Sequence, residues 1–196
     1  MFDAHAFRDA LGTFVTGVTI VTARDEQGQP FGLTANSFNS VSLDPPMVLW
    51  SLSLQSRTLP VFRDAENWAV HVLAADQQDM SDRFARPGED KFAGLTATDG
   101  PEGAPLIEGC AARFGCRARF EYEGGDHAIF LGEVVDFDRR DAEPLIYHGG
   151  SYGRVQRRLS GENLEREGLA ERVGEELSLT ASGAELLAAL QSLAKR

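Results

Sequence analysis

The sequence lacks the marks of several protein classes. Its 196 residues include only two cysteines, Cys110 and Cys116, with no C-x-x-C pair and no paired histidines, so a metal site is not expected. On one extended strand these thiols would lie roughly 20 Å apart, too far for a disulfide. We therefore expect free thiols in a reducing compartment. Because the N-terminus also shows no signal pattern, this indicates the cytoplasm.

Signatures of several enzyme classes are missing as well. There is no G-x-G-x-x-G between a strand and a helix, no G-x-x-x-x-G-K-[ST] and no G-x-S-x-G, so a Rossmann domain, a P-loop enzyme and a serine hydrolase are unsupported. No run approaches ~18 apolar residues, so we expect no membrane span. Basic residues are scarce: 19 Lys and Arg against 30 Asp and Glu give a formal net charge of −11, which argues against nucleic-acid and anionic-membrane partners.

What is present is a series of short β-type runs separated by turn residues. We expect strands over residues 16–22, 30–37, 47–52, 68–73, 111–122, 127–138 and 144–148, and short helices over 3–11, 59–65 and 76–84. Asp3 and either Thr58 or Ser56 are the predicted N-caps of the first two helices. Most strands are linked as hairpins, which favours an antiparallel barrel over a parallel sheet.

A polar stretch between the second and third strands, residues 32–46 (GLTANSFNSVSLDPP), is the first candidate site. Strand alternation puts Thr34, Asn36 and Phe38 on one face. Leu33 and Ala35 then share the other. The two prolines that end the stretch cannot donate ladder hydrogen bonds, so we expect strand pairing to stop there. Hydroxyl and amide groups with one aromatic suit a flat ring with polar edges, although the composition fits a plain polar loop equally well.

Two further places carry candidate chemistry. His127 follows Gly-Gly-Asp in a predicted turn, and its neighbour Asp126 could orient the imidazole. Residue chemistry alone favours a turn histidine without a role. The segment 51–58 offers hydroxyls, Arg57 and a helix start, a combination that can hold a phosphate. The alternative is a capped helix with a solvated arginine. His71 alternates inside a strand and reads as a core residue.

Several segments together carry a family resemblance. They are GVTIVT (17–22), GLTANSF (32–38), SVSLDPP (40–46), SRT (56–58), SDRF (81–84), DKF (90–92), GGDH (124–127) and YHGGSY (147–152). In order and spacing, over about residues 5–153, the chain resembles the flavin reductase-like proteins with an FMN-binding split barrel. These are the small NAD(P)H:flavin oxidoreductases that serve two-component monooxygenases. The implied fold is mainly β, a split antiparallel barrel over residues 1–153.

The resemblance also implies a site. FMN or FAD would be bound by Asn36, Ser37, Phe38, Ser40, Ser42, Ser51, Leu52, Ser53, Ser56, Arg57, Thr58, Arg83, Phe84, Lys91 and Phe92. The nicotinamide of NADH or NADPH would be bound by Asp126, His127, Tyr147, Gly150 and Tyr152. His127, as a positioning group for the nicotinamide, is the one catalytic assignment. No side chain need act as an acid or base, because the cofactor does the chemistry.

The implied activity is NAD(P)H-dependent reduction of flavin by direct hydride transfer, with the reduced flavin supplied to a separate monooxygenase. The resemblance also implies a homodimer. The alternatives are a flavin-binding sensor or regulatory protein, and a split-barrel oxidoreductase acting on another substrate. If no flavin supported the oxidation of NADH or NADPH, the reductase activity would be excluded and these alternatives would be favoured.

The composition changes after Tyr152. Residues 154–196 hold no aromatics, and Leu186, Leu187, Leu190 and Leu193 form an apolar stripe. Residues 176–180 predict a strand that leads into a helix capped by Thr180 or Ser182. This part resembles the wing and closing helix of MarR-type winged-helix regulators. We predict that it packs on the barrel or on another subunit and modulates turnover.

Overall fold

The computed structural model describes residues 3–88, 90–95, 98–100, 103–155, 161–173 and 176–193. The chain divides into two compact units, Met1–Val155 and Gln156–Arg196, called here the barrel unit and the C-terminal unit. Strands make up most of the regular structure of the barrel unit, which confirms the predicted mainly β class. Along the parts of the chain that are described, no helix is long and apolar enough to cross a membrane.

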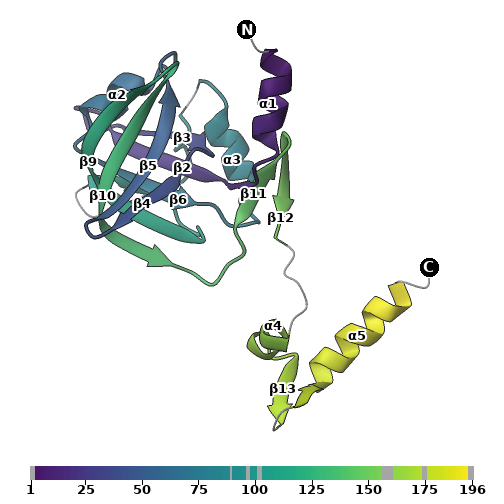
Figure 1. Ribbon diagram of the computed structural model, residues 1–196. Helices are drawn as coiled ribbons and strands as arrows, with labels where there is room; N and C mark the ends of the chain where they lie inside the picture. The colour runs from purple at the N-terminus through teal and green to yellow at the C-terminus, as the bar shows by residue number, and fades with distance from the viewer. Residues whose placement is uncertain are drawn as a thin grey trace. The chain divides into compact units, whose positions relative to one another are not determined.

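A seven-stranded antiparallel sheet forms the body of the barrel unit (Figure 1). Its strands are β2 (Thr19–Arg24), β3 (Pro30–Ala35), β4 (Asn39–Leu43), β5 (Pro46–Ser53), β6 (Asn67–Val72), β9 (Ala112–Gly124) and β10 (His127–Arg139). The strand order is β3-β2-β6-β9-β10-β5-β4. β3 and β4 are therefore the two edges, yet they are consecutive in the chain. The three-residue link 36–38 passes from one edge to the other.

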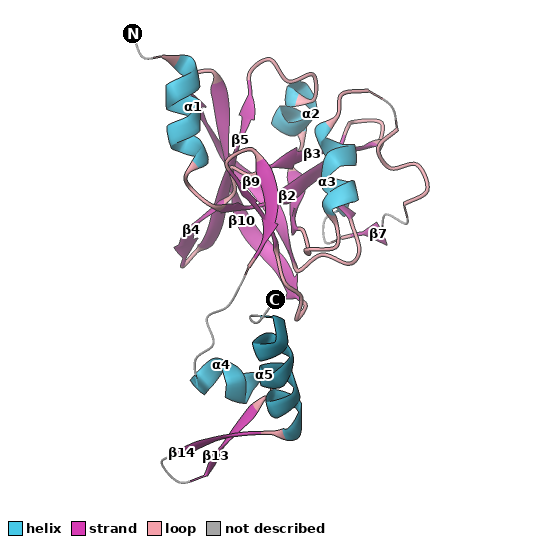
Figure 2. Cartoon of the chain, turned by 90° about the vertical axis from the view of Figure 1, so that its right-hand side faces the viewer, coloured by secondary structure: helices cyan, strands magenta, loops and turns pink. Residues whose placement is uncertain are grey.

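Smaller elements complete the unit (Figure 2). The helices are α1 (Ala4–Gly12), α2 (Leu59–Asp64) and α3 (Gln78–Ala85), and the short strands are β1 (Thr16–Gly17), β7 (Thr98–Asp99), β8 (Pro105–Leu106), β11 (Leu145–His148) and β12 (Ser151–Arg154). β1, β11 and β12 form a three-stranded sheet. The Asp3 carboxylate accepts hydrogen bonds from the first turn of α1, which confirms the predicted cap. The expected β2–β3 hairpin is also confirmed.

Two hydrophobic clusters fill the barrel unit, one on each side of β2. Val21 and Ala23 belong to the first cluster and Ile20 belongs to the second, as strand alternation requires. In the first cluster, Trp50 stacks on Phe130 with ring centroids 4.8 Å apart. The first cluster also holds Leu52, Phe62, Trp68, Val70 and Cys116. The second holds Val18, Leu73, Phe84, Phe92, Ile107, Cys110 and Leu145.

Both cysteines are free and buried, as the spacing predicted. Burial raises the pKa of the Cys110 thiol to about 11 and that of Cys116 to about 12. Because the thiolate is the reactive form, both side chains behave as small apolar core residues.

The first predicted strand, residues 16–22, is divided at Val18. The Val18 N–H donates to the Leu145 carbonyl, whereas its own carbonyl accepts from the Leu73 N–H. The chain therefore changes partners at this residue, from β11 on the N-terminal side to β6 on the other. A continuous β-branched run gives no signal for such a change of sheet.

The polar stretch also departs from expectation. Pairing does not stop at Pro45 and Pro46, because β4 pairs with β5 in a hairpin whose Asp44–Pro45 peptide is cis. The proline nitrogens lie in the turn and at the first position of β5, where no ladder donor is needed. Phe38 was predicted to face away from Ala35 but packs against the same first cluster, because β3 ends at Ala35 and alternation ends with it.

Two predicted loops contain strands. β7 and β8 form a short hairpin inside the expected loop 96–105, although residues 96, 97, 101 and 102 lie outside the described part. β12 follows Gly149 and Gly150, both with positive φ, and pairs with β11. The glycines supply the turn that lets the chain fold back, which the expected end of the last strand at His148 did not anticipate.

The C-terminal unit contains α4 (Gly161–Arg166), β13 (Ala170–Val173), β14 (Glu176–Leu179) and α5 (Ala181–Leu193). β13 and β14 pair as a hairpin. The Thr180 hydroxyl accepts from the Gly183 N–H at 3.2 Å, so Thr180 caps α5 as predicted. Leu186 and Leu187 are 40% and 44% exposed. The side chains of Leu190 and Leu193 lie outside the described part.

Candidate functional site

The link between the two sheet edges is fastened to β5 by one side chain. The Ser37 hydroxyl accepts a hydrogen bond from the Ser51 N–H at 2.9 Å and donates to the Ser51 carbonyl at 3.0 Å. The β4–β5 ladder ends with Asn39 opposite Leu49, and the same register would put Ser37 opposite Ser51. The Ser37 side chain thus makes the hydrogen bonds that the next pair of backbone groups in the ladder would otherwise make. The hydroxyl is occupied by the protein, so any ligand contact of Ser37 would use its backbone.

Ser51 and Ser53 point away from the core. On β5 they alternate with the buried side chains of Trp50 and Leu52. His127 on β10 lies directly opposite Ser53, so these side chains share one face of the sheet. The structure therefore brings together two serines and the histidine that sequence analysis singled out separately. Leu52 was also predicted to bind flavin, but its side chain belongs to the first cluster, which leaves only its backbone for such a contact.

The His127 imidazole is held by its neighbour. Nδ1 lies 2.7 Å from Oδ1 of Asp126, which fixes the ring orientation predicted from the Gly-Gly-Asp-His turn. The hydrogen bond from His127, together with its charge, lowers the pKa of the Asp126 carboxyl, although that carboxyl is fully exposed. The turn is attached to the end of β5, since the Leu54 N–H donates to the Asp126 carbonyl at 2.9 Å.

The segment after β5 forms a tight turn of hydroxyl groups. Ser56 and Thr58 share a hydrogen bond of 2.9 Å between their side-chain oxygens, and the Thr58 N–H donates to the Ser56 hydroxyl. Thr58 occupies the N-cap of α2 as predicted, but its hydroxyl does not cap the helix. Arg57 between them is exposed. This turn therefore presents two hydroxyls and a guanidinium next to Ser53.

Ser40 and Ser42 lie elsewhere. They are on β4 opposite Val48 and Met47. Since a strand rises about 3.3 Å per residue, these positions are roughly 16 to 20 Å along the sheet from Ser53. The structure does not bring these two serines to the same end of β5.

The residues predicted on α3 and after it form a second group. Phe84 and Phe92 are buried and meet edge to face at 5.1 Å within the second cluster. Lys91 Nζ donates to the Phe84 carbonyl at 2.7 Å and to the Gly32 carbonyl at 3.3 Å, so it caps α3 and covers the edge of β3. Partial burial lowers the pKa of the Lys91 ammonium. Arg83 donates to the Ala93 carbonyl. In this arrangement Phe84 and Phe92 are core residues, and the side chains of Arg83 and Lys91 donate to backbone carbonyls of the protein.

The predicted nicotinamide residues near the end of the barrel unit lie on the β11–β12 hairpin. Tyr147 and Tyr152 pack edge to face with centroids 5.3 Å apart, and Gly150 is in the turn between them. The Tyr152 hydroxyl donates to Asp82 Oδ1 at 3.0 Å and lies 2.9 Å from Ser81 Oγ. This hairpin is thus joined to α3, while Asp126 and His127 lie at the β5 end.

Sequence reasoning missed the residues that join these groups. Ser81 is fully buried, and its carbonyl accepts from the Thr34 hydroxyl at 2.7 Å. Ser81, Asp82 and Thr34 all lie within segments that carried the resemblance, but none was given a role. A signal was available: Ser81 is three residues before Phe84 on α3, so the two share the inward face of the helix.

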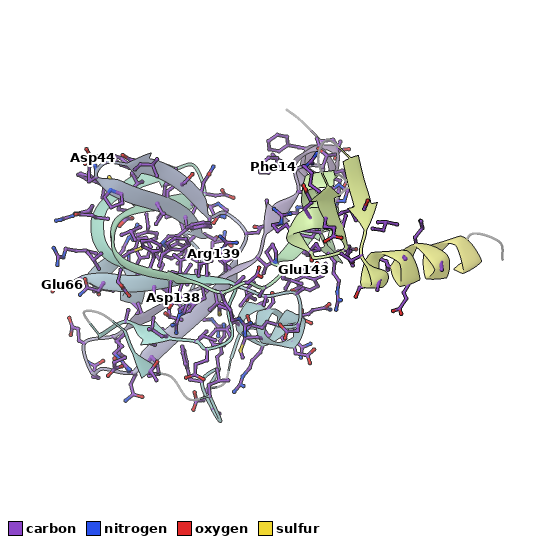
Figure 3. The ribbon with its side chains drawn as sticks, turned by 90° about the horizontal axis from the view of Figure 1, so that it is seen from below. Phe14, Asp44, Glu66, Asp138, Arg139 and Glu143 are labelled. Carbon is purple, nitrogen blue, oxygen red and sulfur yellow. The ribbon has the colours of Figure 1, made fainter. Side chains whose placement is uncertain are left out.

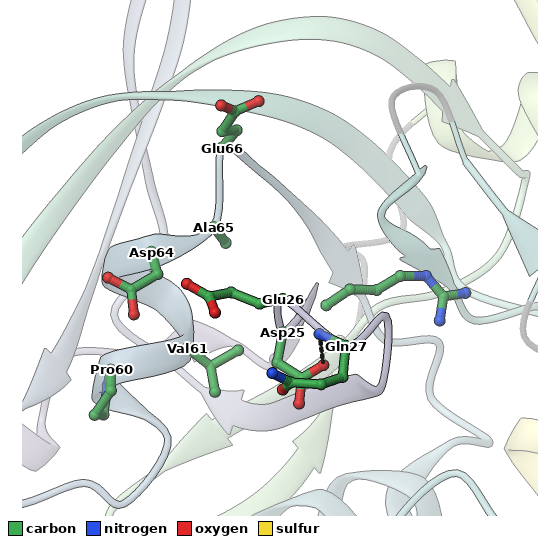
Figure 4. A pocket seen from close by; sticks show the side chains of 9 residues that line it. Asp25, Glu26, Gln27, Pro60, Val61, Asp64, Ala65 and Glu66 are labelled. Carbon is green, nitrogen blue, oxygen red and sulfur yellow. Dashed lines mark hydrogen bonds between the residues drawn. The ribbon is translucent and has the colours of Figure 1, made fainter.

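A separate pocket of about 460 Å³ lies between the β2–β3 turn and α2 (Figure 4). Four carboxylates, those of Asp25, Glu26, Asp64 and Glu66, line it against one cation, that of Arg24. None of the predicted site residues is among its lining. A concentration of negative charge repels phosphate, so this pocket does not suit a flavin nucleotide.

The groups gathered at the end of β5 fit a flavin better than a metal ion. The hydroxyls of Ser51, Ser53 and Ser56 and the imidazole of His127 offer hydrogen bonds without fixed charge, while the exposed Arg57 guanidinium suits a phosphate. Within the ranges that are described, no three His, Cys, Asp or Glu side chains gather as a metal site would require.

Comparison with known proteins gives consistent matches. Residues 11–156 match the family model described as flavin reductase like domain. FMN reductase (NADH) SmoA of Agrobacterium fabrum is 48% identical over 155 residues, which covers 79% of this chain and 88% of that protein. Stachydrine N-demethylase reductase subunit Stc3 of Rhizobium meliloti is 41% identical over 152 residues, covering 78% of this chain and 66% of that one.

A solved structure agrees with these matches. The NADH:FAD oxidoreductase SgcE6 of Streptomyces globisporus, in complex with NAD and FAD fragments, has a TM-score of 0.75 and 39% identity over 79% of this chain and 93% of its own. The chain spans about half the length, 49% and 47%, of two further curated relatives. Because the family model covers well over half of the sequence, the chain belongs to the flavin reductase-like family.

Proposed function

We propose that the protein is an NAD(P)H-dependent flavin reductase that supplies reduced FMN or FAD to a separate monooxygenase. The observation that carries the proposal is the meeting of Ser37, Ser51, Ser53 and the Asp126–His127 pair at one end of β5. These groups come from three distant segments. The β5 serines and the His127 imidazole offer side-chain hydrogen bonds to an uncharged, polar-edged ring, and Ser37 offers its backbone. The relatives named FMN reductase (NADH) and NADH:FAD oxidoreductase support this choice of ligand.

The proposed roles follow from position. The backbone of residues 36–38 and the outward serines of β5 would hold the flavin ring and ribityl chain. Ser56, Arg57 and Thr58 would hold its phosphate. His127, oriented by Asp126, would position the nicotinamide. Arg83, Phe84, Lys91 and Phe92 would support the site through α3 and β3 rather than through side-chain contacts, because their side chains are already engaged by the protein.

Bound flavin and nicotinamide would supply the hydride chemistry themselves. The chain's own contribution would be to orient the two rings and to exclude water from between them. No described side chain at the β5 end is placed as an acid or base beyond the His127–Asp126 pair. A reductase that hands over its product also has to bind reduced flavin weakly enough to release it.

The partner would be an oxygenase. The relative Stc3 is named as the reductase subunit of a demethylase, which supports a two-component arrangement for this chain. The two free thiols support a reducing compartment, the cytoplasm.

We also propose a homodimer. Phe120 and Tyr122 stack on β9 with centroids 6.1 Å apart, and each is 54% exposed. They lie opposite the half-buried Leu131 and Ile129 on β10, which extends the apolar face. Phe14, labelled in Figure 3, is a further exposed ring at 74%. Large exposed apolar side chains of this kind are typical of a protein interface. Sedimentation of the wild-type chain and of Phe120→Asp tests the homodimer, and we expect a dimer for the wild type and a monomer for the variant. A monomeric wild type would contradict the proposal.

The direct test of the proposed activity is consumption of NADH or NADPH in the presence of FMN or FAD, four combinations in all. The expected result is flavin-dependent nicotinamide oxidation in at least one combination. Flavin titration without NADH separates binding from turnover. A chain that binds flavin but oxidises neither nicotinamide would instead be a sensor.

A further inference from the structure

Tyr152 was expected to contact the nicotinamide, but its hydroxyl is already committed within the protein. It donates to Asp82 Oδ1 at 3.0 Å and lies 2.9 Å from Ser81 Oγ, both on α3. Ser81 is completely buried and Tyr152 is half-buried, so this hydrogen bond is partly screened from water. The hydroxyl therefore fixes β12 to the middle of α3.

α3 in turn is seated on β3. The Thr34 hydroxyl donates to the Ser81 carbonyl at 2.7 Å. A Cβ added at Gly32 would lie 2.6 Å from Phe84 Cε1, so the helix and the strand are in close contact there. Lys91 bridges the Gly32 and Phe84 carbonyls. Three separate contacts thus hold α3 against one strand.

That strand has only one partner within the sheet. β3 is an edge and pairs with β2 alone within the sheet, so its contacts with α3 add to the support that it receives. Thr34 is two residues before Asn36, where the link to β4 begins, and Ser37 in that link is clipped to Ser51. The link is therefore held in its middle by β5, through Ser37, and the strand that leads into it is held by α3, through Thr34.

We propose that Tyr152 is a positioning residue for the flavin site: by holding α3 through Ser81 and Asp82, it sets the end of β3 and hence the backbone of residues 36–38. This inference rests on the proposed function for the identity of the ligand. A nicotinamide contact would predict a change in the KM for NADH, whereas this inference predicts a change in the flavin Kd. Loss of the hydroxyl weakens flavin binding and leaves nicotinamide use unaltered.

Tyr152→Phe is the primary variant, because it keeps the ring packed on Tyr147 and removes only the hydroxyl. Oxidised FMN and FAD are titrated separately by quenching of flavin fluorescence, and the KM for NADH is measured alongside. The variant removes two partly buried hydrogen bonds, and a net loss the size of one typical hydrogen bond corresponds to about a fivefold change in an equilibrium constant. We expect the flavin Kd to rise about fivefold and the KM for NADH to stay within about twofold of wild type.

Two further variants distinguish positioning from general damage. Ser81→Ala removes the hydrogen bond to Ser81 but leaves the one to Asp82, so its effect should be smaller than that of Tyr152→Phe, and the double variant should add little to Tyr152→Phe. Asp82→Asn keeps an acceptor for the Tyr152 hydroxyl and should retain most of the flavin affinity. If Tyr152→Phe does not fold, the comparison of Ser81→Ala with Asp82→Asn serves in its place.

A raised KM for NADH with an unchanged flavin Kd in Tyr152→Phe would overturn the inference in favour of a nicotinamide contact. Unchanged values for both constants, or full additivity with Ser81→Ala, would overturn it as well. The flavin titration needs no turnover. A wild-type chain that binds flavin without oxidising NADH would therefore contradict the proposed function while leaving this inference open to the same test.

Discussion

The Ser37 hydroxyl contacts both backbone groups of Ser51, accepting from its N–H at 2.9 Å and donating to its carbonyl at 3.0 Å. This pair of hydrogen bonds extends the β4–β5 ladder by one rung made from a side chain. It also fixes the link that joins the two edges of the sheet. Residues 36–38 of the polar stretch are thus held in place by β5, as the proposed flavin site requires.

Ser37→Ala should leave the Ser51 N–H and carbonyl without these partners in a half-buried position. An unsatisfied group of this kind costs about 1–3 kcal/mol. We expect a lower free energy of unfolding by about that amount in urea titrations, together with weaker flavin binding. Ser40→Ala, at an exposed position on β4, is the matched control and should change stability by less than about 0.5 kcal/mol. Equal effects of the two variants would contradict the role given to Ser37.

His71 should make stability depend on pH. The ring is fully buried, lies 3.0 Å from the Ile20 carbonyl through Nδ1, and accepts from the Ile107 N–H at 3.1 Å through Nε2. Burial lowers its pKa to about 4 from an ordinary value of 6.5. The unfolded chain then binds the proton more readily than the folded one, so stability is complete above about pH 6.5 and falls as pH drops toward 4.

The size of that loss is on the order of 3 kcal/mol, since each pKa unit corresponds to about 1.4 kcal/mol. Urea titrations between pH 4 and 7 measure it. His71→Gln, which cannot titrate, should be less stable at pH 7 and should show a flatter pH dependence over the same range. If the free energy of unfolding depended on pH as steeply in His71→Gln as in wild type, other titrating groups would be responsible.

His127→Ala should affect nicotinamide use more than flavin binding. The variant removes the imidazole that Asp126 orients but leaves the β5 serines in place. Loss of about one hydrogen bond predicts a rise of roughly fivefold in the KM for NADH, with the flavin Kd within about twofold. His5→Ala on α1 removes an imidazole at an exposed position and serves as the control. A variant that mainly loses flavin binding would show that His127 has been given the wrong role.

Deletion of residues 156–196 should change turnover or flavin affinity. Leu179, Leu186 and Leu187 of the C-terminal unit are 40–44% exposed, and apolar side chains of this size favour a covering surface. The prediction that this unit modulates the reductase follows from that exposure and from the resemblance to a wing and closing helix. NADH oxidation, flavin titration and sedimentation of the truncated chain check it. No change in any of the three would contradict it.

Strand alternation and turn chemistry were enough to predict much of the fold. β2 is an example. Its β-branched run precedes a D-E-Q-G turn, which predicts a strand in a hairpin, and its alternating side chains enter both hydrophobic clusters. The division of the first strand at Val18 was not predictable, because it depends on Leu145 and Leu73, which are far away in the sequence.

The structure brings together Ser51, Ser53 and His127, which were predicted separately, whereas the directions of several other side chains were not predicted. A motif places a residue in the chain, whereas packing decides which way it faces. Phe84 and Phe92 follow acidic and basic residues in similar motifs, yet both turn into the second cluster. Ser37 was predicted to line the ligand, and it would do so through its backbone, because its hydroxyl is bonded to Ser51. Such outcomes depend on contacts between segments that no local pattern encodes.

The most direct test of the account is an anaerobic reaction of the full-length chain with FMN or FAD and NADH, in which flavin bleaching and nicotinamide oxidation are followed together. Hydride transfer between the two cofactors predicts equal amounts of flavin reduced and nicotinamide oxidised, without oxygen. His127→Ala should slow this reaction at low NADH and recover at high NADH. No bleaching with either flavin, using NADH or NADPH, would contradict the assignment of a flavin reductase.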